Sequence, residues 1–533
     1  MKRKIMAGLL SAAVLVAALT ACDAGAAATT APAEDAAAAV EEAAEAVEEA
    51  AEEVAEVAEA ASEEWEGDVD EINILFFDLR GVGENSKEVL DAMNEITAKK
   101  AGVKIAQARF GAVAEYGNAV SLALSSGEQL DVVGLFPADP ASFQAMVANG
   151  QLMDITDLME EYGKETLDMM GDYIYGMSNN GRILGLPCWR NYSSALYLIM
   201  RNDVLEDLGL MEKAQAMTSW SEMEEIWAAV AESGFNGSEF GSYRQQAGTL
   251  LNADKFADAK PYDNLSDAYG LVFTDGEGNV SLTLENPDYI ESLEAQKGYW
   301  DNGWVYKDAL TTEEHVDTLT KAGIIFSSFQ TSEMGVETSK KEATGYDETC
   351  IEVSKNMLGS SYVNKFGMAV PVTAQEPEAA VRWLNAVWTD PELENLLIWG
   401  IEGRDYVVTE TGEADFPEGS DGNVPYHGAD FVMGNYFNAY PWAGNGGDFR
   451  QKAFDYLMDS EISPYMGFTA DNSELANTMT AINSVFQKYS RSILFGAYAD
   501  GDIDKYIAEL KTAGVDEYLG IMQSQLDAWR AAQ

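Results

Sequence analysis

The sequence predicts an α/β protein built of two lobes, and three observations lead to this prediction. From residue 72 onward, apolar segments of strand length alternate with amphipathic segments of helix length. The stretch 179–209 then passes from a tight turn through two apolar runs, separated by Pro187, into a capped helix, as a chain crossing between two bodies would. With 533 residues, the chain is long enough for more than one hydrophobic core.

The N-terminus has the pattern of an export signal. Lys2, Arg3 and Lys4 precede an apolar stretch at 5–18, and small residues then lead to Cys22. The segment Leu-Thr-Ala-Cys at 19–22 resembles a bacterial lipobox, which implies cleavage before Cys22 and a lipid anchor on its thiol. The alternative is an ordinary secretory signal with an incidental cysteine. We therefore assign residues 1–22 to a lipoprotein signal peptide.

Residues 23–66 form an Ala/Glu-rich tether without Lys or Arg. Ala and Glu favour helix, so a semi-rigid rod rising ~1.5 Å per residue is expected. Val40, Val47 and Val54 recur at intervals of seven residues. The alternative is therefore that this helix forms a coiled coil with a partner.

The first lobe is predicted from strands at 72–77, 103–110 and 130–136, with helices between them. Strands separated by helices imply a parallel sheet covered on both faces. Ligands on such sheets bind beyond the carboxyl ends of the strands. The side chains at these ends are Phe77, Asp78, Arg80, Phe110, Tyr116, Phe136 and Asp139.

The crossover and the second lobe follow. A turn at 179–181 leads into a strand at 182–186 that Pro187 stops, and 195–200 is apolar enough for a buried strand. Further on, Ser219 and Glu222 form a capping box before a helix. We also expect a hairpin at 272–282, buried strands at 323–326 and 366–370, and a helix at 376–390.

Several of these segments resemble one protein family. Residues 181–187, GRILGLP, are similar to "G-x-I-Y-x-I-P", and 197–209 to "Y-x-x-x-x-L-x-x-x-G"; 219–222 match "T-W-x-E-L". Residues 400–406 resemble "G-I-E-G-x-x-Y". Together with SPYMGF at 463–468 and residues 510–529, this segment carries the rest of the resemblance. The chain thereby resembles bacterial extracellular solute-binding lipoproteins of ABC importers, of the maltodextrin-binding class, in the subset with a C-terminal domain of unknown function.

The resemblance implies a two-lobed periplasmic-binding-protein-like fold of class II, with the ligand cleft between the lobes. Lobe I would comprise 67–187 plus 366–410, and lobe II 188–365 plus 411–533 with the C-terminal helical region. The lobes would close over a solute and present the closed form to the transmembrane subunits of a permease. A monomer without a cofactor, anchored on the extracytoplasmic face of the membrane, is expected.

An oligosaccharide is the expected solute, because aromatic faces stack on sugar rings and planar polar groups bind hydroxyls. We expect Trp189 and Arg190 to contribute most, since they follow Pro187 at the crossover. For each aromatic residue, core packing is an equally good interpretation. The full set of expected ligand contacts is Phe77, Asp78, Arg80, Phe136, Trp189, Arg190, Tyr192, Phe329, Gln330, Asn435, Tyr436 and Trp442.

Other classes of function find less support. The excess of 90 acidic over 33 basic residues, a net charge of −57, argues against nucleic acid. His315 and His427 are far apart and lack metal-ligand spacing, and no nucleophile elbow occurs, so we expect neither a metal site nor an enzyme. Cys188 and Cys350 are expected to be free and buried, although pairing stays open.

Two alternatives to oligosaccharide import are kept. A peptide or amino-sugar binder of the same fold is favoured if Asp78 and other acids meet a cation. A surface sensor or adhesion lipoprotein that uses the same fold is the other.

Overall fold

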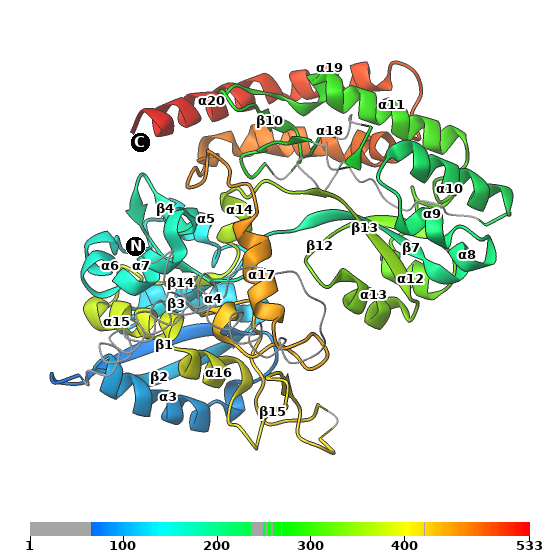
Figure 1. Ribbon diagram of the computed structural model, residues 1–533. Helices are drawn as coiled ribbons and strands as arrows, with labels where there is room; N and C mark the ends of the chain where they lie inside the picture. The colour runs from blue at the N-terminus through cyan, green and yellow to red at the C-terminus, as the bar shows by residue number, and fades with distance from the viewer. Residues whose placement is uncertain are drawn as a thin grey trace, which may run out of the picture.

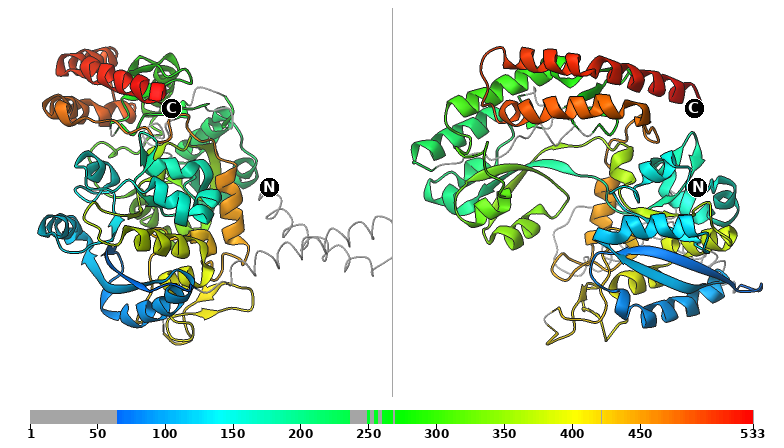
Figure 2. Two further views of the ribbon diagram at one scale, coloured as in Figure 1. Left: turned by 90° about the vertical axis from the view of Figure 1, so that its left-hand side faces the viewer. Right: turned by 180° about the vertical axis from the view of Figure 1, so that it is seen from behind.

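The computed structural model describes residues 65–235, 249–250, 254–256, 260–267, 269–420 and 422–532. The predicted signal peptide, the lipidation site Cys22 and the tether up to residue 64 lie outside these residues. Two lobes are seen in Figure 1, with a layer of C-terminal helices above them, and Figure 2 shows the same arrangement from the side and from behind. Among the helices described, none combines the length and apolarity that crossing a bilayer requires.

Lobe I is built on a five-stranded sheet in the order β2-β1-β3-β14-β6. Strand β1 runs parallel to β2 and β3, as the βα alternation predicts, whereas β14 is antiparallel to both of its neighbours. Helices α3, α15 and α16 pack together on one face, and α4 lies on the other (Figure 1). These elements are β1 (Asp70–Asp78), β2 (Val103–Ala112), β3 (Val132–Leu135), β6 (Leu186–Pro187), β14 (Gly367–Ala369), α3 (Lys87–Lys100), α4 (Val113–Ser126), α15 (Pro377–Thr389) and α16 (Pro391–Trp399).

Shorter elements complete lobe I. They are η2 (Gly83–Asn85), α5 (Phe143–Ala148), α6 (Thr156–Tyr162), α7 (Lys164–Met170), η3 (Gly171–Met177), β4 (Ser178–Asn179), β5 (Arg182–Ile183), α14 (Ser360–Val363), β15 (Val407–Val408), β16 (Ala414–Asp415), η7 (Tyr436–Asn438) and α17 (Phe449–Met458).

Lobe II contains an antiparallel sheet in the order β12-β7-β13. Along the central strand, Leu196, Leu198 and Met200 enter the core under helices α8 to α10, while Tyr197 and Ile199 face the α13 side. Both faces of β7 are therefore buried, which explains its continuous apolar sequence. The elements are β7 (Ala195–Arg201), β12 (Ser327–Ser332), β13 (Glu348–Lys355), α8 (Asn202–Asp207), α9 (Met211–Gln215), α10 (Trp220–Glu232), α12 (Val316–Lys321) and α13 (Val336–Thr344).

A third core joins the end of the chain to lobe II. The hairpin β10–β11 and helix α11 supply one side of this core, and the last three helices supply the other. The C-terminal helices are thus fixed to lobe II. These elements are β10 (Val272–Thr274), β11 (Val280–Leu282), η6 (Thr283–Glu285), α11 (Pro287–Asp301), η8 (Ser473–Leu475), α18 (Ala476–Leu494), α19 (Asp502–Ala513) and α20 (Val515–Ala532); the short β8 (Thr249–Leu250) and β9 (Lys260–Pro261) pair nearby.

Most predicted elements are present, and two local predictions are corrected. The capping box is confirmed, because Ser219 Oγ accepts the Glu222 N–H and the Glu222 carboxylate accepts the Thr218 N–H at 2.9 Å. The predicted strand at 323–326 is wrong: β12 begins only at Ser327, and the buried apolar residues before it fill the core as irregular chain. The predicted strand at 182–186 is divided between β5 and β6, which pair with different partners.

The boundary between the lobes is also corrected. Residues 411–533 were expected in lobe II, but the lobe I core includes Ala414, Tyr426, Met433 and Leu457. Trp189 belongs to this core as well, so the crossing falls a few residues after Pro187. The chain packs with lobe I until about Met466, because its apolar side chains there meet α15 and α16 rather than the third core.

A buried carboxylate, that of Asp131, connects the lobe I sheet to α15. Asp131 is fully buried just before β3, and its Oδ2 accepts the Asn73 N–H and the Gln129 side-chain amide, both at 2.8 Å. Its Oδ1 accepts the N–H groups of Gln375 and Glu376 at 2.9 and 3.0 Å. These bonds hold β1 and the start of α15 to a single side chain.

We predict that Asp131→Ala lowers the free energy of unfolding by about 3 kcal/mol, because it leaves three backbone N–H groups and one side-chain amide without their acceptor. The exposed Asp207 in α8 provides the control, and Asp207→Ala should change stability by less than about 0.5 kcal/mol. Urea unfolding followed by circular dichroism measures both; equal midpoints for the two variants would contradict this role of Asp131.

Candidate ligand-binding site

The two lobes are joined where the chain leaves β6 for β7, where it returns from β13 to β14, and again near residue 466, where it passes to the third core. The first two crossings form the junction described here. The two crossing segments are bonded to each other: Asn356 donates its backbone N–H to the Ser194 carbonyl at 3.0 Å and its side-chain amide to Ser194 Oγ at 3.1 Å. On the lobe I side, the Trp388 indole N–H donates to the Pro187 carbonyl at 2.9 Å. The junction is therefore held by hydrogen bonds at both ends.

A pocket of ≈ 450 Å³ opens at this junction. Its walls come from the outgoing segment after β6, from the end of β12 in lobe II, and from α14 and the returning segment. The volume lies within the range typical of small-molecule sites. The lining residues are Arg190, Tyr192, Ser194, Thr331, Ser332, Glu333, Ser361, Tyr362 and Lys365.

Charged and hydroxyl groups share the pocket wall. Arg190 Nη1 donates to Glu333 Oε1 at 2.9 Å, and only 12% of the Arg190 side chain is exposed. Desolvation lowers the pKa of Lys365, and the neighbouring Arg190 guanidinium lowers it further. The Arg190 guanidinium also lies 5.6 Å from the ring centre of Tyr192. Such a wall offers fixed donors, one carboxylate and two aromatic rings to a ligand rich in hydroxyls.

A layer of aromatic side chains supports the pocket from lobe I. Trp189 is 1% exposed, and its ring packs against Tyr173 and Tyr192 with centroid distances of 5.3 and 6.0 Å. Its backbone bonds to the chain before η7: its N–H donates to the Gly434 carbonyl, and its carbonyl accepts the Tyr436 N–H. The Tyr192 hydroxyl donates to the Cys188 carbonyl. Trp189 therefore lies beneath the pocket and holds Tyr192 in place.

Comparison with known proteins finds one family model, one sequence relative and several solved structures of similar fold. Residues 464–531 match the family described as "Domain of unknown function (DUF3502)". The chain is 22% identical over 455 residues, covering 83% of this chain and 88% of the relative, to a "Carbohydrate ABC transporter substrate-binding protein" of Streptococcus pneumoniae serotype 4. A solved N-glycan transport solute binding protein of Streptococcus pneumoniae superposes with a TM-score of 0.68 at 20% identity, over 86% of this chain and 99% of that one.

The chain has the solute-binding-protein fold. An extracellular solute-binding protein of Bifidobacterium longum subsp. infantis superposes as well, with a TM-score of 0.60 at 14% identity, over 86% of this chain and 98% of that one. The resemblance and the two-lobed fold class inferred from the sequence are thus confirmed.

Within the solute-binding fold, the pocket brings together two of the expected contacts, Arg190 and Tyr192. Burial is the main cause that raises the pKa of Tyr436 to about 12, and the negative charge of Glu333 raises it further. Its ring stacks under the Arg450 guanidinium at 3.5 Å. These three expected contacts therefore lie in or beside one site.

Two more expected contacts form an aromatic row at the strand ends of lobe I. Phe77 is buried and packs against Phe136 at a centroid distance of 4.9 Å. Both touch Phe366, which follows Lys365 of the pocket wall and packs against Phe431 at 5.7 Å. Phe431 is 40% exposed and ends the row at the surface. Phe77 thus supports the row rather than presenting a free face.

Three more of the expected contacts, Asp78, Asn435 and Trp442, have structural roles in this conformation. Asp78 accepts four backbone N–H groups of its own loop, from 80 to 83, and Arg80 beside it is exposed. Asn435 is buried and donates to the Trp388 carbonyl at 2.9 Å. Trp442 packs against Trp399 and His427 in lobe I.

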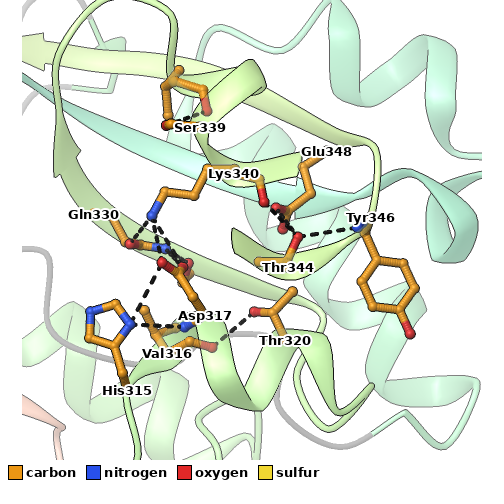
Figure 3. Close-up of polar contacts among 12 residues, drawn as sticks. His315, Val316, Asp317, Thr320, Gln330, Ser339, Lys340, Thr344, Tyr346 and Glu348 are labelled. Carbon is orange, nitrogen blue, oxygen red and sulfur yellow. Dashed lines mark hydrogen bonds and ion pairs between the residues drawn. The ribbon is translucent and has the colours of Figure 1, made fainter. Parts of the chain in front are cut away.

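The two expected contacts on β12 point to opposite faces of the lobe II sheet. Phe329 is buried against Trp227 in the lobe II core. Gln330 lies on the other face, where Lys340 Nζ donates to its Oε1 at 2.6 Å and to the Asp317 carboxylate at 3.0 Å (Figure 3). Its amide group therefore joins α12 and α13 to the strand.

Sequence reasoning missed Glu333, Tyr362, Lys365 and Phe431. Glu333 lies three residues after the expected contact Gln330, and Lys365 directly precedes the predicted strand at 366–370. Nothing local distinguishes these two residues from the other charged residues of the sequence. Cys188 is buried and Cys350 half-buried, and both are free. Among the described residues, no cluster of His, Cys, Asp and Glu is arranged to hold a metal ion.

We predict that Trp189→Ala destabilises the protein by about 3–5 kcal/mol, because it leaves a cavity in the lobe I core. Glu333→Ala should change stability by less than about 1 kcal/mol, because the carboxylate is half exposed. Chemical unfolding of the unliganded protein tests both. A Trp189→Ala protein as stable as the wild type would show that its side chain lies outside the core.

Proposed function

We propose that this protein is the substrate-binding component of an ABC importer and that it captures an oligosaccharide at the junction of its lobes. One observation carries the proposal: the pocket at the crossover takes its walls from both lobes. A solute bound there contacts each lobe, so it stabilises whichever orientation of the lobes gives the larger contact.

The chemistry of the pocket supports a sugar. Hydroxyl groups of Ser194, Ser332 and Ser361 line it together with the rings of Tyr192 and Tyr362. Aromatic faces suit the CH surfaces of sugar rings, and charged planar groups bind pairs of hydroxyls. The carbohydrate and N-glycan transport functions of the relatives support the same class of solute.

The cellular setting follows from the sequence. Cys22 would carry a lipid anchor, and the Ala/Glu-rich tether would hold the lobes away from the extracytoplasmic face of the membrane. There the closed, loaded form would meet the transmembrane subunits of the permease as a monomer. We infer capture and release of the solute without chemical change, which the binding functions of the relatives support.

A panel of solutes followed by thermal unfolding tests the proposal. A neutral oligosaccharide at a hundred times its Kd should stabilise the protein by about 2.7 kcal/mol. A shift with peptides and none with sugars would favour the peptide-binding alternative. No shift with either class would favour a surface sensor or adhesion protein.

A substitution in the pocket sharpens this test. Tyr362→Ala should weaken oligosaccharide binding at least tenfold, because it removes a ring from the pocket wall. Tyr269 provides the matched control, because it is also half-buried but packs against Phe486, outside the crossover pocket. Tyr269→Ala should bind as the wild type does. Titration calorimetry measures both affinities; unchanged binding by Tyr362→Ala would place the sugar elsewhere.

A further inference from the structure

A second and larger pocket, of ≈ 800 Å³, lies between lobe I and the C-terminal domain. Its lower wall comes from α5, the loop before it and the β4–β5 turn, and its upper wall from 468–472 and the end of α20. Figure 1 shows α20 above the part of lobe I that carries β4 and α5. All of the upper wall falls within 464–531, the segment that matches a family of unknown function.

Helix α14 separates this pocket from the one at the crossover. On one side, Ser360 Oγ accepts the Gly467 N–H at 2.8 Å, next to Phe468 of the larger pocket. On the other side, Ser361 and Tyr362 line the crossover pocket. Gln144, in the lower wall of the larger pocket, donates to Asn364 Oδ1 at 2.9 Å, one residue before Lys365 of the crossover pocket. The two pockets are therefore neighbours across one helical turn.

The upper wall combines an aromatic surface with an unused acceptor. Trp529 is half-buried and packs edge to face against Phe468 at a centroid distance of 6.0 Å. Gln525 fixes the loop, since its side chain both donates to and accepts from the Asp471 backbone at 2.8 Å. Asn472 Oδ1 is buried and has no hydrogen-bond partner among the described residues. A buried acceptor of this kind is costly, so a small shift of the 469–472 loop that lets a ligand hydroxyl donate to it would be favoured.

The charges of the wall narrow the class of ligand. Asp139 and Asp471 line the pocket, and none of the described residues that line it is a Lys, Arg or His. Without a cation, the pocket disfavours sulfated, phosphorylated or uronic saccharides. Amide side chains, including Asn179 and Asn180 from the β4–β5 turn, match neutral hydroxyls instead.

We propose that the C-terminal domain and lobe I together form a second carbohydrate subsite, which binds uncharged sugar units of an oligosaccharide whose other end occupies the crossover pocket. The inference rests on the proposed function and extends it, because it gives the domain of unknown function the task of recognising chain length. A short saccharide fills the crossover pocket alone, whereas a longer one passes α14 and reaches Trp529.

Titration calorimetry on the full chain tests the inference with two neutral saccharides of mannose and N-acetylglucosamine, a disaccharide and a branched hexasaccharide. Trp529→Ala changes the upper wall. Asn180→Gly changes the lower wall and retains the turn, because Asn180 has a φ of 52°, which glycine adopts readily. Trp300→Ala is the matched control, since Trp300 is also a half-buried tryptophan but lies in α11 outside the pocket.

The wild type should bind the hexasaccharide more tightly than the disaccharide. Trp529→Ala and Asn180→Gly should each weaken hexasaccharide binding about tenfold, in the range of one lost stacking contact or a lost pair of hydrogen bonds, and leave disaccharide binding unchanged. The control should match the wild type for both saccharides.

Each contrary result has a distinct meaning. If the wild type shows the length preference and both pocket variants keep it, the second subsite is overturned while the proposed function stands. An equal loss for both saccharides also overturns the subsite, because Trp529 would then act through the fold. Absence of sugar binding by the wild type overturns the proposed function and the subsite together.

Discussion

The junction between the two crossing segments is the constraint on which the rest of the structure depends. Asn356 on the returning chain bonds twice to Ser194 on the outgoing chain, and Trp388 holds the Pro187 carbonyl from the lobe I side. These bonds align the start of β7 with the end of β13, so that the end of β12 faces the segment after β6. A pocket with walls from both lobes is the direct consequence.

The chemistry of the pocket follows from the same alignment. Arg190 lies on the outgoing chain, Glu333 follows β12 in lobe II, and Lys365 lies on the returning chain. Their charges meet because three separate segments converge at one place, and the Arg190–Glu333 ion pair spans the two lobes. A ligand that displaces or bridges this pair would therefore act on the orientation of the lobes. The C-terminal domain is fixed to lobe II through the third core, so a change in the orientation of that lobe would carry this domain with it.

The sequence predicted the order of elements better than the direction of single side chains. The parallel strands, the crossover at Pro187, the capping box and the C-terminal domain were all legible from periodicity and motif. Trp189 and Arg190 could not be told apart, because neighbours in an extended segment point to opposite sides and only the packed lobe decides which side is core. Here Trp189 lies in the core and Arg190 in the pocket wall.

The return of 411–466 to lobe I had no local signal either. Its apolar side chains fit any core of the right shape, and pairing with α16 is set by contacts between residues far apart in the sequence. Glu333 and Lys365 were missed for the same reason, since 90 acidic and 33 basic residues make single charges uninformative until the fold brings three of them together.

The most direct test of this account is the distance between the lobes with and without a sugar. Spin labels at Glu95→Cys in α3 and Glu337→Cys in α13 occupy exposed positions, one on each lobe. Burial raises the pKa of the Cys188 thiol, and it raises the pKa of the Cys350 thiol to about 12, so both native thiols should react slowly with the labels. Cys22 is replaced in the labelled variants so that it adds no further thiol. The account predicts that saturating oligosaccharide narrows the label distance distribution and shifts it to a new value. An unchanged distribution at saturation, with binding confirmed by calorimetry, would contradict capture by movement of the lobes.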